Sequence, residues 1–417
     1  MSDYPIRLTV TDDLKRNRVT VFFRLILIIP HVIWFFLWAI AAAIAAIVNW
    51  FATLIVGQSP AGLHEFIARF ARYSTHVSAY FFLLANDYPK FTGEAGYAVD
   101  LEIDPPAPQP RWSTFLRIFL AIPAIAISTA LTGGGGGGGR SNNSGGPLQV
   151  VGFLGWFVSL VRGEMALGMR DLGAYTLGYS AQAWGYLFLL TDRYPNSDPA
   201  LIGSPAPLPD HPVRMRVSDD RRRSRLTVFF RLLLGIPHII WLFLWGIVAT
   251  IAVIINWFAT LFTGRSPDSL HGFLAKYVRY QTHVSAYLLI VANRFPGFAA
   301  EPYDIDLDIA PSERQNRWIT GFRAILVIPA LALSSGISGV LFLIALFGWF
   351  ASLITGRMPE GLRNLGAYGL RYSAQVTAYA YVLTEQYPYS GPPALSADAP
   401  GGPNEPASSE LGVGLAA

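Results

Sequence analysis

Histidine is the residue whose type and spacing in this chain could most directly support chemistry. A separation of 207 positions relates three pairs of histidines, and paired imidazoles on membrane helices can bind haem or a metal ion. The matching positions elsewhere in the chain hold Ala, Arg or Gln, which do not preserve a set of ligands. We therefore expect no metal site and no cofactor. The six histidines are His31, His64, His76, His238, His271 and His283.

One of these pairs has polar counterparts in every part of the chain. His76, Gln182, His283 and Gln375 each lie near the middle of a segment that we expect to be the last helix of a repeat. An ionisable side chain at membrane depth costs at least about 2.5 to 3.5 kcal/mol, so its presence suggests a function. These four residues are a candidate polar site within the membrane. Hydrogen bonding between neighbouring helices, worth about 0.6 kcal/mol on average, is the favoured reading of the four positions, and a polar cavity that they line is the alternative.

A second repeated set is basic. Arg24, Arg117, Arg231 and Arg323 each lie about one turn into an apolar helix. Arginine at such a position can extend its guanidinium group to the membrane surface, so we expect contacts with the phosphates of lipid headgroups. We find no catalytic set. The chain has no cysteine, and its glycine-rich run lacks the Lys-Ser/Thr pair of a phosphate-binding loop, so we expect no enzyme activity.

The composition indicates which medium must surround these residues. Hydrophobic residues make up 52% of the 417 positions and charged residues 14%, about half the usual charged fraction. Runs without charge from Leu25 to Val56 and from Leu232 to Thr263 exceed the roughly 20 residues that cross a bilayer. We predict an all-α polytopic protein of the plasma membrane, with cytoplasmic termini and no cleaved targeting segment. The basic residues beside these runs favour anionic lipid headgroups as partners, not nucleic acid.

The chain is built from four copies of one unit. Adding 207 to a position in the first half reaches a matching residue in the second, as with Trp50 and Trp257. Within the first half the offset is 93 before a glycine-rich insertion and 106 after it. We predict repeat units at residues 1–107, 108–200, 201–310 and 311–390, with the insertion at 133–146, a linker opening the third unit and a disordered tail at 391–417.

Each unit opens with a short segment in which apolar and polar residues alternate, which is typical of a half-buried strand. Its polar positions are largely basic in the first and third units, for example Arg7, Arg214 and Arg216. Opposite charges across a strand pair stabilise it, so we expect odd strands to pair with even strands on one face. A calcium site is a weaker alternative, because no glycine-turned loop is present. The acidic positions of the even strands are Asp100, Glu102, Asp304, Asp306 and Asp308.

The rest of each unit is predicted to be helical. We expect the first apolar helix to break after about 20 residues, at the glycine-rich insertion and at the equivalent Ser334 to Gly336. Ser59 and Ser266 are predicted N-caps of an amphipathic last helix. If each unit crosses the membrane twice, the chain has eight spans and all strands share the cytoplasmic side. A third crossing near Asn49 to Val56 would give twelve spans with inverted units.

Two sequence features resemble a known family. They are Phe-Phe-Arg-x-x-x-x-Ile-Pro-His at Phe22 to His31 and at Phe229 to His238, and a closing Tyr-Pro or Phe-Pro in each unit. The chain thereby resembles tandem copies of domain of unknown function 4389, an uncharacterised and largely actinobacterial family of polytopic membrane proteins. The even units depart from it, with Ala124 and Ala330 in place of His. The resemblance implies a membrane location and no known activity.

Two classes of function remain open at this stage. The four repeats favour a binding or transport protein with a polar site in the membrane, because repeats commonly meet around such a site. The alternative is a structural or scaffolding membrane component that presents a small cytoplasmic β-face. An intramembrane enzyme is a third reading, without a nucleophile or an acid–base pair to support it. The arrangement of His76, Gln182, His283 and Gln375 around one cavity or in separate contacts discriminates between the first two.

Overall fold

The computed structural model describes residues 4–134, 145–203 and 205–393, and one order of elements recurs four times within it. Each unit has a strand, one or two short helices, a long apolar stretch and a last helix. The central part of the predicted insertion and most of the predicted tail lie outside the described residues. Unit by unit, the elements are β1 (Ile6–Val10), α1 (Arg18–Phe22), α2 (Arg24–Leu27), α3 (Ile29–Val56) and α4 (Ala61–Phe81); β2 (Val99–Ile103), α5 (Arg111–Phe115), α6 (Arg117–Thr132), α7 (Pro147–Arg162) and α8 (Leu167–Leu187); β3 (Val213–Val217), α9 (Arg225–Phe229), α10 (Arg231–Thr263) and α11 (Asp268–Leu288); β4 (Ile305–Ile309), α12 (Arg317–Gly321), α13 (Arg323–Leu326), α14 (Ile328–Thr355) and α15 (Glu360–Ala380).

The strands pair as their charges predict. Strand β1 pairs antiparallel with β2, and β3 pairs antiparallel with β4, so each odd strand meets an even one. The register places Arg7 opposite Glu102, and the Arg7 guanidinium also contacts Asp104 at 2.7 Å. In the second half, Arg214 lies opposite Asp308. Opposite charges facing each other across a strand pair stabilise it, and this part of the sequence prediction is confirmed.

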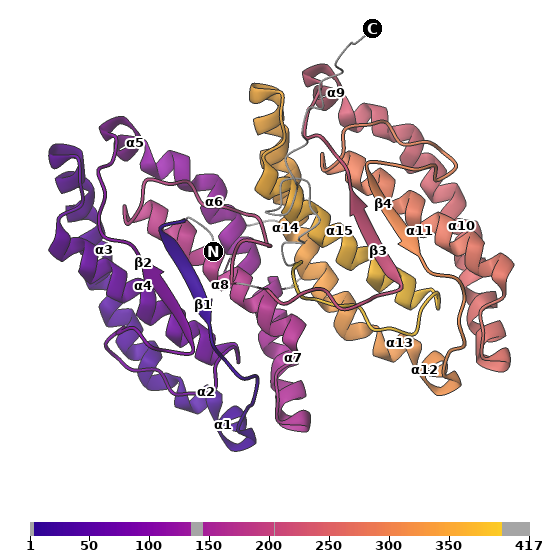
Figure 1. Ribbon diagram of the computed structural model, residues 1–417, viewed down its shortest axis with the longest axis horizontal. Helices are drawn as coiled ribbons and strands as arrows, with labels where there is room; N and C mark the ends of the chain where they lie inside the picture. The colour runs from indigo at the N-terminus through magenta and orange to yellow at the C-terminus, as the bar shows by residue number, and fades with distance from the viewer. Residues whose placement is uncertain (1–3, 135–144, 204, 394–417) are drawn as a thin grey trace, which may run out of the picture.

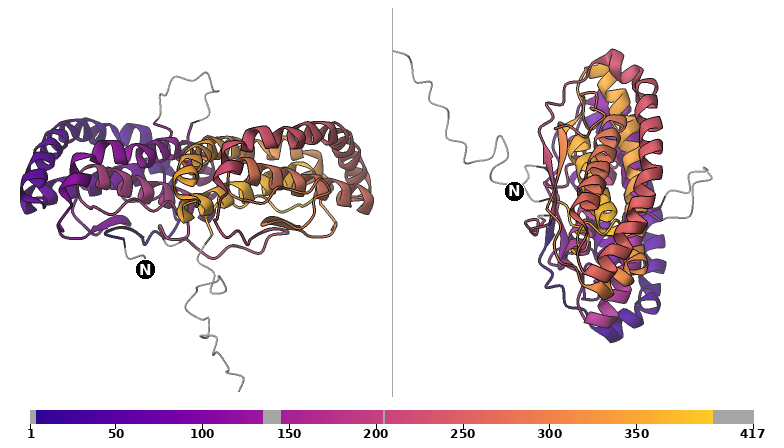
Figure 2. Two further views of the ribbon diagram at one scale, coloured as in Figure 1. Left: turned by 90° about the horizontal axis from the view of Figure 1, so that it is seen from above. Right: turned by 90° about the vertical axis from the view of Figure 1, so that its right-hand side faces the viewer.

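The described elements form a flat molecule of three layers, as Figures 1 and 2 show. The long helices α3, α6, α7, α10 and α14 make one outer layer, the last helices α4, α8, α11 and α15 make the middle layer, and the strands lie on the opposite face. The pattern of burial explains the packing. In α3, the buried positions Ala42, Ala45, Asn49 and Thr53 recur every three or four residues, which gives one stripe for α4 to cover.

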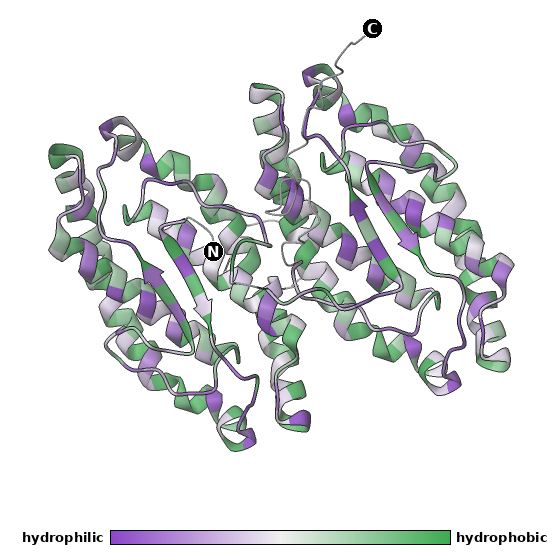
Figure 3. Ribbon diagram, in the orientation of Figure 1, coloured by the Kyte–Doolittle hydropathy of each residue, from purple (hydrophilic) through white to green (hydrophobic). Residues whose placement is uncertain are grey.

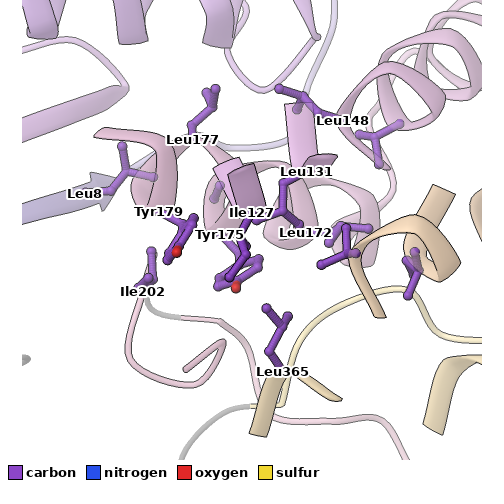
Figure 4. Close-up of a cluster of buried hydrophobic side chains, with 14 of the residues drawn as sticks. Leu8, Ile127, Leu131, Leu148, Leu172, Tyr175, Leu177, Tyr179, Ile202 and Leu365 are labelled. Carbon is purple, nitrogen blue, oxygen red and sulfur yellow. The ribbon is translucent and has the colours of Figure 1, made fainter. Parts of the chain in front are cut away.

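One hydrophobic core joins the two halves. Figure 4 shows its centre, where Tyr175 on α8 and Ile127 on α6 belong to the same cluster as Leu365 on α15. Helix α14 of the second half packs along α6 and α7 of the first. A Cβ atom at Gly336 would lie 3.1 Å from the backbone oxygen of Gly145, so glycine permits this close approach of the two halves.

The long helices are continuous at places where we predicted breaks. Helix α14 passes through Ser334 to Gly336 without interruption, and α3 continues to Val56. The hydroxyl of Ser338 donates to the carbonyl of Ser334 at 2.8 Å, so a polar side chain in this segment is satisfied inside the helix. The predicted break is present only in the second unit, between Thr132 and Pro147.

The predicted N-caps are also wrong. Helix α4 begins after Pro60, and no side chain caps it. The Ser59 hydroxyl donates instead to the Asn49 side chain at 2.7 Å, and Ser266 donates to Asn256 at 2.6 Å. A buried amide on an apolar helix needs a partner, and this need takes the serine hydroxyl away from the helix end.

Within the described residues, three helical stretches are long and apolar enough to cross a membrane. They are Arg24–Val56, Arg231–Thr263 and Arg323–Thr355, each of 33 residues. Helices α6 and α7 are shorter apolar helices. The last helices of the units are not among these candidates, although the prediction of eight spans requires each of them to cross.

Candidate polar site between helices and strands

The two histidines of the predicted site bind strand carboxylates. His76 on α4 and His283 on α11 are buried, with 1% and 0% of their surface exposed. The Nε2 atom of His76 lies 2.8 Å from Oδ1 of Asp100 on β2, and His283 is at the same distance from Asp306 on β4. Each odd unit therefore holds the strand of the next unit through one imidazole–carboxylate contact.

The two glutamines hold strands through backbone groups. The side-chain amide of Gln182 donates to the carbonyl of Ile6 on β1 at 3.2 Å and accepts from the backbone N–H of Asn196 at 3.1 Å. Gln375 makes the equivalent pair of bonds, to Val213 on β3 and from Tyr389, at the same distances. In the first half, α8 thus anchors β1 and α4 anchors β2; in the second half, α15 anchors β3 and α11 anchors β4.

These four contacts answer the question that the sequence left open. Each polar side chain of the predicted site bonds a different segment, and the described contacts join each helix to a strand or loop. They are neither one shared site nor the contacts between helices that we favoured. The geometry is that of four separate anchors, which fix the strand layer onto the middle layer of helices.

Asp306 has a stronger set of partners than Asp100. The carboxylate of Asp306 also forms an ion pair with Arg279, and its Oδ1 accepts from the guanidinium Nε at 2.6 Å. Burial would raise the pKa of Asp306, but the hydrogen bonds from Arg279 and His283 outweigh it and hold the pKa below its usual range. Burial also lowers the pKa of His283, so the fold favours a neutral imidazole beside an ionised carboxylate.

The carboxylate of Asp100 is held by His76 and by two backbone groups. Its Oδ2 accepts from the N–H of Gly96 at 2.6 Å, and its Oδ1 accepts from its neighbour Leu101 at 2.8 Å. Burial would raise the pKa of Asp100, but the bonds from His76 and from these backbone groups lower it overall. Arg72, which corresponds to Arg279, donates to the carbonyl of Leu101 instead.

The repeated arginines do not reach the surface, which corrects the predicted contacts with lipid headgroups. Each guanidinium group is buried under the end of the last helix of its unit and lies over a tyrosine ring, as Arg24 lies 4.1 Å above Tyr80. Arg24 donates to the carbonyls of Tyr80 at 2.6 Å and Ala85 at 3.1 Å. Carbonyls at a helix C-terminus carry partial negative charge, which attracts the cation inward. Arg117, Arg231 and Arg323 are likewise buried over tyrosine rings and donate to backbone carbonyls; Arg117 and Arg323 also donate to the side chains of Gln109 and Gln315, both at 2.7 Å.

The remaining repeated histidines also have partners within the protein. His31 and His238 contact the hydroxyls of Tyr73 and Tyr280. His64 and His271 lie near backbone carbonyls, at 3.4 and 3.3 Å. Among the described residues, no group of three or more His, Asp or Glu is arranged to hold a metal ion.

Sequence reasoning identified the four anchors but not their partners. We read Asp100 and Asp306 only as charges facing basic strands, whereas each also accepts a hydrogen bond from a buried histidine. A usable signal was present. The units with His in the last helix are followed by strands with Asp at the matching position, and the units with Gln are not.

Comparison with known proteins identifies a family and little more. A family model described as Domain of unknown function (DUF4389) matches residues 18–93, 225–300 and 317–390, which together make up more than half of the chain. The second unit, which carries the insertion, is not among the matches. No curated protein and no solved structure matches the chain significantly.

Proposed function

This chain belongs to the family described as a domain of unknown function (DUF4389), and we propose that it is a non-catalytic membrane protein that lies flat in one leaflet. Its long helices are embedded along their length in hydrocarbon, and its strand layer faces water as a surface on which other molecules can assemble. This proposal replaces a polar site in the membrane with a structural role, because the four polar side chains of that site are already used as anchors.

The observation that carries the proposal is the position of one exposed ion pair, which lies beside the middle of a long apolar helix. Trp38, near the middle of the stretch Arg24–Val56, packs against Phe66 and Phe70 of α4 with ring centroids 6.3 and 5.9 Å apart. Glu65 and Arg69 lie on the same turns of α4 and form an ion pair at 2.8 Å, with more than half of each side chain exposed. The second half repeats this pattern, since the exposed Lys276 lies between two residues that pack against Trp245.

The level of these charges disfavours a perpendicular crossing. If α3 crossed the bilayer, the exposed pair of Glu65 and Arg69 would lie near its centre, where each charge costs at least about 2.5 to 3.5 kcal/mol. If the molecule lies flat, the same charges face water together with the strands. The helical stretch is also long for a crossing, because 33 residues extend about 50 Å, whereas the hydrocarbon core is about 30 Å thick.

The exposed surface of the outer helix layer supports hydrocarbon as its medium. Large apolar side chains are exposed along the whole of the first stretch, from Leu25 at 66% to Phe36 at 66% and Ile55 at 73%. Figure 3 shows hydrophobic residues along much of the long helices, whereas hydrophobic and hydrophilic residues alternate on the strands. Soluble monomers rarely expose apolar side chains over so long a continuous stretch, so these residues indicate contact with lipid or with another apolar surface.

Arginines border this layer at both ends of its helices. The exposed Arg18 donates to the carbonyl of Val161 at the end of α7, and the exposed Arg111 donates to that of Ile55 at the end of α3, each at 2.9 Å. In a spanning helix, basic residues concentrate on one side of the membrane. Their presence at both ends agrees with a layer whose two ends meet headgroups of the same leaflet.

Thiol labelling tests the proposal, because the natural chain has no cysteine. We expect single cysteines introduced by Glu65→Cys and Glu102→Cys to react with a membrane-impermeant maleimide from the same side of sealed vesicles. The variant Ile40→Cys serves as the protected control. Protection of Glu65→Cys until detergent is added would place α4 in hydrocarbon and refute the flat arrangement.

A further inference from the structure

We infer that the first half contains a binding site for one hydrocarbon chain of a membrane lipid, and that the second half lacks this site. The inference rests on the proposed function, since it requires the layer of long helices to be in contact with lipid. The site is a cavity of about 420 Å³ between α3 on one side and the junction of α6 and α7 on the other, with α4 and α8 beneath.

The break in the second unit creates this cavity. Helix α6 ends at Thr132 and α7 starts at Pro147, so the described wall there is formed by Thr132, Gly134, Leu148 and Gln149 instead of a continuous helix. Because α3, α6 and α7 all belong to the outer layer, the cavity opens toward the lipid-facing side of the molecule. A bilayer that covers this layer must place a chain at the opening.

The second half differs at the matching positions. There, α14 runs without a break, and Phe342 occupies the position that corresponds to Gln149. The residues that correspond to Phe70 and Phe188 are Tyr277 and Tyr381, whose rings stack with centroids 6.3 Å apart across the groove. These two tyrosines therefore bridge α11 and the C-terminal end of α15, where the first half leaves space.

The lining of the cavity selects an uncharged, apolar occupant. None of the described residues that line it is Asp, Glu, Lys, Arg or His, and its largest side chains are aromatic, including Trp184 with 43% of its surface exposed. Several hydroxyls in the wall already have partners, since Thr75 and Thr132 donate to carbonyls of their own helices and Ser180 accepts from Ser128. A volume of about 420 Å³ falls within the usual range of about 300–1,000 Å³ for small-molecule sites.

Photolabelling within one molecule provides the test, because the second half is an internal control. We would reconstitute the full chain in vesicles of phosphatidylcholine that contain a phosphatidylcholine with a diazirine in the middle of one acyl chain, and map the adducts by mass spectrometry. We expect at least fivefold more adducts in segments 74–82 and 180–188 than in their counterparts 281–289 and 373–381. Equal labelling of the two halves would overturn the site.

Filling the cavity gives a second, independent readout. Ser180→Phe should reduce the adducts in the first half at least fivefold, whereas Ser373→Phe at the matching position should leave them unchanged. Ala181→Leu fills the same cavity and decides the question if Ser180→Phe fails to fold, and persistent labelling in Ala181→Leu would refute the site. Adducts along the exposed face of α3 report separately on the membrane. If they are present without enrichment at the cavity, only this inference fails; if they are absent, the proposed function fails as well.

Discussion

Replacement of one buried arginine tests whether these residues hold the fold together or contact lipid. Arg231 has 2% of its surface exposed, and its guanidinium donates to the carbonyls of Tyr287 and Ala292, both at 2.9 Å. It also lies 4.3 Å from the ring centroid of Tyr287. Arg231→Met removes these interactions: the Ala292 carbonyl loses its bond from the guanidinium, and the Tyr287 carbonyl keeps only the backbone N–H of Ile290, at 3.0 Å. The methionine side chain fills part of the volume but supplies no hydrogen bond.

The expected effect is large. A hydrogen bond from a charged group contributes about 1.5–3 kcal/mol, and a buried carbonyl without a partner costs about 1–3 kcal/mol. Removal of the charge also relieves its desolvation cost, which offsets part of this loss. We expect the free energy of unfolding to fall by about 3–5 kcal/mol, the range measured when one partner of a buried charge interaction is removed. For a folding unit of about 200 residues this lowers Tm by on the order of 10 °C.

Thermal unfolding of the full chain in nanodiscs, followed by tryptophan fluorescence and far-ultraviolet circular dichroism, measures this effect. Arg225→Met is the matched control, because Arg225 is exposed and lies six residues earlier in the same unit. We expect the control to change stability by less than about 0.5 kcal/mol. An unchanged Tm for Arg231→Met, together with weaker binding to vesicles of anionic lipid, would show that Arg231 reaches headgroups and would refute the anchoring role.

Three further predictions follow from the contacts of the strands and of the insertion. The folded-state pKa values of His283 and Asp306 are both depressed, so acidification should lower Tm, first below about pH 6.5 for the histidine and then near and below about pH 4 for the aspartate. Because other buried histidines also have lowered pKa values and because His283 helps to depress the pKa of Asp306, His283→Gln should reduce both parts without abolishing either; a pH-independent Tm of the natural chain would contradict this. Asp308→Lys should destabilise the β3–β4 pair by roughly 0.2–1 kcal/mol, and adding Arg214→Glu should restore the lost stability. Purely additive effects in a double-mutant cycle would show that the two residues do not interact. Deletion of residues 135–144 should leave the amount of membrane-integrated protein unchanged, because Gly133 and Gly146 are already in close contact and the entropy of loop closure changes only slowly with loop length. A loss of membrane-integrated protein would show that the segment is needed for folding.

The sequence predicted local patterns better than the arrangement of the elements. Alternation of charge identified both strand pairs, since pairing of Arg7 with Glu102 depends on local period and complementary charge. It did not reveal that the strands lie along the middle of the last helices. We placed His76 at membrane depth because we expected the last helix of each unit to cross the bilayer, yet His76 is buried within the protein against a strand carboxylate.

The buried arginines show a second limit of sequence reasoning. A guanidinium group one turn inside an apolar helix can extend to a headgroup or turn inward to carbonyls. The sequence around Arg24 does not distinguish these outcomes, because its acceptors, Tyr80 and Ala85, lie more than 50 positions away. The prediction that Ser59 and Ser266 cap helices was wrong for the same reason, because the competing acceptor of the Ser59 hydroxyl is a side chain on another helix.

The most direct test of the flat arrangement is a depth profile along the first long stretch. Spin labels on single cysteines introduced at Leu25, Ile33, Ile40, Ile47 and Ile55, all of which are exposed on the apolar layer, report depth through collisions with oxygen and with a water-soluble nickel complex. We predict that all five depths fall within about 10 Å, one helix diameter, with both end positions accessible to the nickel complex from the same side of sealed vesicles. A profile deepest at Ile40, rising by about 15 Å toward both ends, with Leu25 and Ile55 reached from opposite sides, would show that the helix crosses the bilayer and would contradict the account.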